Sequence, residues 1–130
     1  MLKEKSVPKV EARIKDLIKR MTLEEKIAQL SSVPCKFDFK PQLSLLETGK
    51  FSKKKARQIL SKGMGHITRL MGGTLDITGP RQAAKIANEI QRFLIEETRL
   101  GIPVIIHEEC LSGFMAYGVR YKDVTCRTIS

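Results

Sequence analysis

The sequence of 130 residues predicts an α/β fold built around a parallel sheet. Residues 63–70 have the composition of a short strand, and Pro80 opens a predicted helix that runs to about Thr98. Residues 102–106 form a continuous apolar run, which is typical of a strand buried on both faces. Helices that alternate with such strands are the pattern of an α/β protein, and the length suits one domain or part of a larger one.

The N-terminal region predicts two helices that meet at a sharp corner. Apolar side chains spaced three or four residues apart form one stripe across residues 10–21. Thr22 and Glu25 have the spacing of a capping box, in which each side chain bonds the backbone amide of the other residue, so a second helix begins there. We expect the inner face of this second helix to carry Leu23, Ile27 and Leu30.

The middle of the chain predicts an irregular segment followed by two helices. Residues 31–51 contain the breakers Pro34, Pro41 and Gly49. Ser52 is expected to cap a helix that ends near Lys62. The predicted buried positions of that helix are Ala56, Ile59 and Leu60. The positions that follow the helical period on the later, longer helix are Ala84, Ala87, Ile90, Phe93, Leu94 and Glu97.

The charge is basic and uneven, which keeps a second function open. The net charge is +10, and residues 1–62 hold 16 basic and 7 acidic side chains. Such a basic half is compatible with a small nucleic-acid-binding module. However, the aromatic residues do not interleave with the basic runs as base-stacking platforms would. We therefore expect no nucleic-acid partner and treat this module as the alternative function.

The remaining composition favours a cytoplasmic chain. No apolar run approaches the length of a transmembrane helix, and the first 30 residues lack the apolar core of a secretory signal. The three cysteines, Cys35, Cys110 and Cys126, are odd in number and form no CxxC pair, which favours reduced thiols. We expect no membrane partner, no metal and no cofactor.

The residues that suit chemistry cluster at 107–113, directly after the apolar run 102–106. Ligands of parallel α/β sheets bind at the carboxyl ends of strands, so this is the favoured position for a site. Glu108 and Glu109 are neighbours and point to opposite faces of an extended chain, so they are not the carboxylate pair that cleaves a glycosidic bond. Either carboxylate suits hydrogen bonds to substrate hydroxyls or an ion pair with a nearby basic residue. Cys110 is interpreted as a packed thiol rather than a nucleophile.

Three segments resemble glycoside hydrolase family 3, in its β-xylosidase and β-glucosidase branch. They are residues 10–30 (VEARIKDLIKRMTLEEKIAQL), residues 63–70 (GMGHITRL) and residues 84–118, which contain HEECLSG. The resemblance implies the N-terminal portion of a (β/α)₈ barrel and retaining hydrolysis of β-linked glycosides. It also implies a substrate-binding role for Glu109, which occupies the position of a family Asp that binds glycone hydroxyls.

The chain also departs from the family. Residues 119–130 do not continue its pattern, and no residue corresponds to the family's nucleophile or general acid/base. We therefore expect residues 1–118 to be the N-terminal part of the barrel domain and residues 119–130 to be a divergent tail left by truncation or frameshift. On this interpretation the chain contributes no catalytic residue and is inactive alone. A separate chain that supplies the C-terminal part of the barrel is the macromolecular partner it implies.

Overall fold

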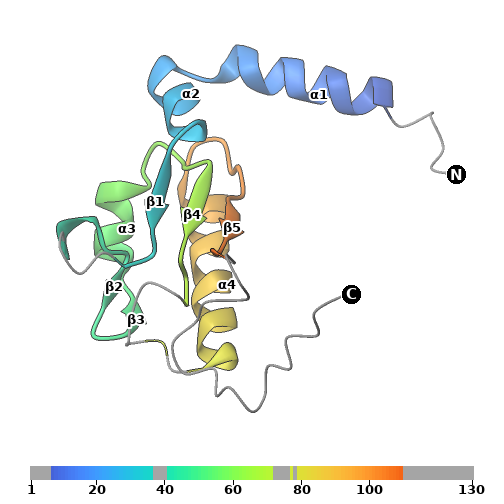
Figure 1. Cartoon of the computed structure of the whole chain (residues 1–130). Coiled ribbons are helices and arrows are strands. Elements are labelled where there is room, and N and C mark those ends of the chain that lie inside the picture. Colours follow the sequence, from blue (N-terminus) through green and yellow to red (C-terminus); the bar gives the residue numbers. More distant parts are fainter. Residues whose placement is uncertain (1–6, 37–40, 72–76, 78, 110–130) are drawn as a thin grey trace, which may run out of the picture.

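The computed structural model describes residues 7–36, 41–71, 77 and 79–109 (Figure 1). The predicted divergent tail at 119–130, the glycines at 72 and 73, and Cys110 and Cys126 lie outside these residues. The helices are α1 (Val7–Arg20), α2 (Leu23–Gln29), α3 (Lys53–Ile59) and α4 (Pro80–Glu97), with a 3₁₀ turn at Pro41–Leu43. The strands are β1 (Ser32–Pro34), β2 (Leu46–Glu47), β3 (Lys50–Phe51), β4 (His66–Thr68) and β5 (Ile105–His107).

A parallel sheet of three strands, in the order β1-β4-β5, confirms the α/β class. Its register places Pro34, Thr68 and His107 level with one another at the carboxyl ends of the strands. The expectation that residues 31–51 are irregular is wrong at β1, which is a strand only because β4 offers a partner. It is also wrong at the β2–β3 hairpin, whose two-residue turn at Thr48 and Gly49 has positive φ at both positions, 47° and 73°.

The core lies between the sheet and α4, which packs against α3 and β3. The buried positions of α4 are Ala83, Ile86, Ile90, Phe93 and Leu94. Ala84, which was expected on the inner face, is exposed because the helix turns Ala83 toward the sheet instead. The ring of Phe93 meets that of Phe51 edge to face, with centroids 6.1 Å apart.

The predicted inner face of α2 is wrong for the described residues. Leu23, Ile27 and Leu30 are all exposed, Leu30 to 89%. On α1 the stripe is covered only in part, since Ile14 and Ile18 are about half exposed. The stripe on α1 is exposed because α1 extends away from the sheet and no described element packs along it (Figure 1). None of the described helices combines the length and apolarity that crossing a bilayer requires.

The apolar run at 102–106 enters the sheet later than expected and at its edge. β5 begins at Ile105, and the side chain of Ile105 is 61% exposed, so burial on both faces is wrong within the described part of the chain. The entry to β5 is fixed by α4. Gln91 donates from Nε2 to the Val104 carbonyl at 2.7 Å and accepts from the Val104 amide at 3.0 Å.

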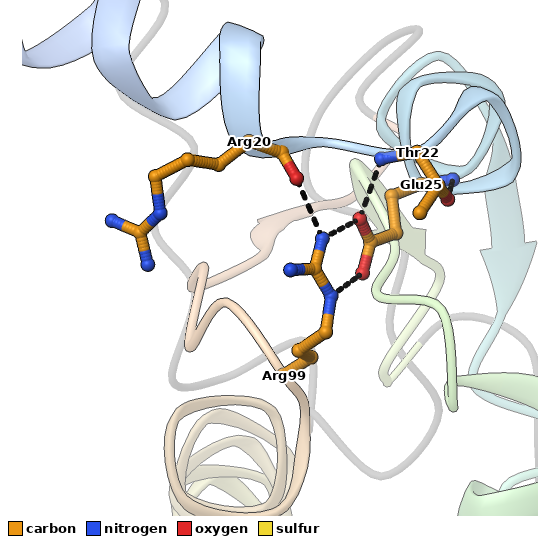
Figure 2. A network of polar contacts seen from close by, with 4 residues as sticks. All are labelled: Arg20, Thr22, Glu25 and Arg99. Carbon is orange, nitrogen blue, oxygen red and sulfur yellow. Dashed lines mark hydrogen bonds and ion pairs between the residues drawn. The ribbon is translucent and has the colours of Figure 1, made fainter.

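The carboxylate of Glu25, on α2, forms a network with Arg99 of the α4–β5 loop and with the end of α1 (Figure 2). This network lies at the amino ends of the strands. The capping box is confirmed, since Glu25 accepts from the Thr22 amide at 2.8 Å and donates from its own amide to the Thr22 hydroxyl. Arg99 donates to both oxygens of Glu25, at 2.9 and 2.5 Å, and also to the Arg20 carbonyl at 2.8 Å. Hydrogen bonding from Arg99 is the largest cause that lowers the pKa of Glu25, and the bond from the Thr22 amide is the second. The pKa of Glu25 falls to about 2.

Candidate functional site

The carboxyl ends of β1, β4 and β5 form one edge of the sheet, at the end away from α2 (Figure 1). Backbone bonds continue past the last paired residues, since Cys35 donates to the Thr68 carbonyl and Arg69 to the His107 carbonyl, each at 3.0 Å. The residues after all three strands are therefore held side by side. This edge brings together Cys35, Arg69 and Met71 with the predicted cluster His107, Glu108 and Glu109.

Glu109, the predicted substrate-binding residue, lies two residues beyond β5 and is exposed. Among the described residues, no side chain or amide hydrogen-bonds to its carboxylate. Its neighbour Glu108 is only partly exposed, which fits opposite directions for the two side chains. Within the described part of the chain, the Glu109 carboxylate is exposed at this edge of the sheet.

Glu108 has a different environment from Glu109. Its Oε1 accepts a hydrogen bond of 2.5 Å from the Met71 amide, 37 residues earlier in the chain. Its Oε2 is buried, and no donor among the described residues reaches it. Sequence reasoning left Glu108 with two roles, a ligand to substrate or an ion-pair partner, and did not find this contact with a backbone amide.

Cys35 packs at the end of β1 and is fully buried. Burial raises the pKa of its thiol to about 12, and the charge of Glu108 contributes to the same shift. The thiol therefore stays protonated at neutral pH, and a nucleophilic role for it is excluded. Cys110, the thiol considered from the sequence, lies outside the described residues.

The two histidines meet at this sheet. The rings of His66 on β4 and His107 on β5 lie edge to face, with centroids 5.6 Å apart. The parallel register of β4 and β5 brings these two residues, 41 positions apart in the sequence, into contact. In the described part of the chain, no three His, Cys, Asp or Glu side chains gather as metal ligands would.

The basic residues of α3 are engaged elsewhere. Lys53 and Arg57 both pair with Glu97 at the end of α4, at 2.7 and 2.9 Å, and Lys55 donates to the Leu46 carbonyl. These contacts hold α3 to α4 and to the hairpin. They give two of the three lysines at 53–55 a partner within the chain, while Lys54 is exposed.

The fold and this edge define an α/β chain whose exposed carboxylate follows a parallel strand, the position at which barrel enzymes bind their substrates. The family model of the glycosyl hydrolase family 3 N-terminal domain matches residues 22–125, so the chain belongs to glycoside hydrolase family 3. The resemblance stated from the sequence is confirmed.

Two curated relatives carry glycosidase names. The chain is 30% identical over 112 residues to the "Putative beta-xylosidase" of Formosa agariphila, covering 84% of this chain and 14% of that protein. It is 37% identical over 107 residues to "Beta-glucosidase C" of Emericella nidulans, covering 81% of this chain and 15% of that protein. The chain therefore spans about one seventh of the length of these relatives.

Proposed function

We propose that this chain supplies the opening strands of a family 3 β-glycosidase barrel and that Glu109 holds a hydroxyl of a β-linked xyloside or glucoside. The observation that carries the proposal is the exposed carboxylate of Glu109 after β5 in a chain of this family. The names of the two relatives support xylosides and glucosides as the substrate class. An ionised carboxylate suits this role, since its hydrogen bonds to hydroxyls are about twice as strong as those of a neutral acceptor.

The same proposal assigns Glu109 to binding and not to bond cleavage. Retaining hydrolysis needs two carboxyl groups roughly 5 Å apart that both face the scissile bond. Glu108, the adjacent carboxylate, is held by the Met71 amide through Oε1, and its Oε2 is buried. We therefore propose that the polypeptide of these 130 residues binds glycosides and does not hydrolyse them.

The surfaces left open at the sheet and at α2 support a larger barrel as the partner. Ile105 is exposed on β5, the edge strand, where a further parallel strand would pair. Leu23, Ile27 and Leu30 form an apolar face on α2 that further barrel elements would cover. We propose that the rest of the barrel packs against these two surfaces, with its next strand beside β5. It is supplied as a continuation of the polypeptide or as a separate chain.

Ligand-observed NMR of the 130-residue chain with methyl β-xyloside and methyl β-glucoside tests the binding role. The wild-type chain is expected to bind, and Glu109→Ala is expected to weaken binding about tenfold or more, because a hydrogen bond to a charged group is lost. Glu96→Ala is the matched control, since Glu96 is an exposed carboxylate on α4 away from this edge. Equal affinities for wild type and Glu109→Ala would contradict the assignment.

Hydrolysis of an aryl β-xyloside tests the second part of the proposal. The chain alone is expected to release no aryl alcohol above the uncatalysed rate. A measurable rate that disappears in Glu109→Ala would show that the chain is an enzyme by itself and would overturn the assignment of binding only.

A further inference from the structure

The chain turns sharply where β4 ends. Arg69, the first residue after β4, has a φ of 57°, in the left-handed region that residues other than glycine seldom adopt. After this turn Leu70 and Met71 are buried, 7% and 8% exposed. A backbone in such a conformation persists only where its surroundings hold it there.

Two hydrogen bonds from the end of β5 hold this turn. The Arg69 amide donates to the His107 carbonyl at 3.0 Å, and the Met71 amide donates to Glu108 Oε1 at 2.5 Å. The second bond is charge-assisted and is the stronger kind. Residues 69–71 are therefore tied to 107–108 at two points on either side of the turn.

The end of β1 lies at the same edge of the sheet as Glu108. The Cys35 amide donates to the Thr68 carbonyl and the Arg69 amide to the His107 carbonyl, so the ends of all three strands lie side by side, and the charge of Glu108 contributes to the raised pKa of the Cys35 thiol. Only one of the Glu108 carboxylate oxygens has a partner among the described residues, and the other is buried. A partly satisfied buried carboxylate costs free energy that an apolar side chain would not. Holding the Met71 amide is the compensation that the structure offers.

We propose that Glu108 is a positioning residue, which fixes the backbone after β4 against the end of β5 and so sets where its neighbour Glu109 presents its carboxylate. The effect on sugar binding rests on the function proposed above, whereas the anchoring of Met71 does not. Glu108 is not a sugar ligand itself, because Oε1 is occupied and Oε2 is buried.

Hydrogen exchange of the Met71 amide in the 130-residue chain tests the anchoring directly. Glu108→Ala is expected to accelerate this exchange about tenfold or more, since a bond to a charged acceptor is lost. Glu108→Gln keeps a neutral acceptor of the same shape and is expected to restore most of the protection, within about threefold of wild type. Glu96→Ala is expected to leave Met71 unchanged. An unchanged Met71 amide in Glu108→Ala, with the chain folded, would overturn the proposal.

The affinity for methyl β-xyloside, measured by ligand-observed NMR on the same variants, tests the link to Glu109. Glu108→Ala is expected to weaken binding and Glu108→Gln to recover it, a rescue that a loss of overall stability alone would not produce. If the wild-type chain binds no glycoside while Met71 behaves as expected, the proposed function fails and the anchoring stands. If Glu108→Ala does not fold, Glu108→Leu removes the acceptor while filling the space, and an unchanged Met71 amide in that folded variant would overturn the proposal.

Discussion

The close approach of β4 to α2 depends on Gly65, and an added methyl group tests it. A Cβ at Gly65 would lie 1.9 Å from the Gln29 carbonyl oxygen and 2.7 Å from the Gln29 carbonyl carbon, both backbone atoms. Ordinary contact begins at 3.4 Å, so the last turn of α2 must move by about 1.5 Å. A side chain cannot rotate away to relieve this contact, because the obstacle is the main chain.

The cost follows from the bonds that this movement breaks. The Gly65 amide donates to the Ala28 carbonyl at 2.9 Å, and the His66 amide donates to the Ser31 carbonyl at 3.1 Å. Each buried amide left without an acceptor costs about 1–3 kcal/mol. Replacing glycine restricts the unfolded chain and offsets about 0.4–1 kcal/mol of this. We expect Gly65→Ala to lower the free energy of unfolding by about 2–4 kcal/mol.

Urea titration followed by far-ultraviolet circular dichroism measures this free energy. The matched control is Gly79→Ala at the start of α4, where an added Cβ would meet no atom within 4 Å. Its backbone is extended, and the loss of glycine at a helix cap costs about 1 kcal/mol at most. Equal midpoints and slopes for the two variants would refute the reasoning, since they would mean that α2 yields to the added methyl group without losing its bonds to β4.

Three further predictions concern packing, charge and thiol chemistry. Leu94→Ala should destabilise the chain by about 2–5 kcal/mol, because Leu94 is fully buried, whereas its neighbour Ile95 is 53% exposed and Ile95→Ala should cost under about 1 kcal/mol by the same titration. Because the folded pKa of Glu25 is about 2 and its ordinary value is 4.5, its stabilising effect is complete above pH 4.5 and is lost as the pH falls toward 2. The stability gap between wild type and Glu25→Gln should therefore close over that range, and a gap independent of pH would contradict the role of the ion pair. Burial raises the pKa of Cys35 to about 12, so iodoacetamide at pH 8 should label it only after unfolding, as peptide mass spectrometry would show.

The starts of α2, α3 and α4 were predictable because their signals are local, whereas α3 ends at Ile59 rather than near Lys62 as expected. Thr22 and Glu25 cap α2 within one turn, and Pro80 begins α4 as expected. Ser52 begins α3 as predicted, although its hydroxyl donates to Glu47 rather than capping the helix. Such signals depend on residues three or four apart, which share the same turn of helix whatever the rest of the chain does.

The errors arise where a distant partner decides the outcome. β1 has only three residues and ends in Pro34, so nothing in its own sequence marks it as a strand until β4 lies beside it. The apolar face of α2 was expected to be buried because amphipathic helices usually find a core, yet the described residues hold no surface for it. Amphipathic spacing indicates which face is apolar and leaves open what covers it.

The place of Glu109 after a strand of the parallel sheet was predictable, whereas the environment of Glu108 was not. The carboxyl end of residues 102–106 was expected from fold rules, and the resemblance selected Glu109 from the two adjacent carboxylates. The contact of Glu108 with Met71 spans 37 residues and depends on the turn at Arg69, whose positive φ no residue type announces. A hydrogen bond to a backbone amide cannot be predicted from residue types, because every residue except proline carries such an amide.

The carboxylates at the two ends of the sheet differ in how far the protein satisfies them. Glu25, at the amino ends, receives donors on both oxygens, from Thr22 and Arg99. Glu108, at the carboxyl ends, receives one donor on one oxygen, and Glu109 receives none from the described residues. A fully bonded carboxylate has no capacity left for a ligand and acts in stability, as is general at the amino face of barrel sheets. Among the described residues the unmet acceptor capacity therefore increases from the amino ends of the strands toward Glu109, and the proposed function takes sugar hydroxyls as the donors that meet it there.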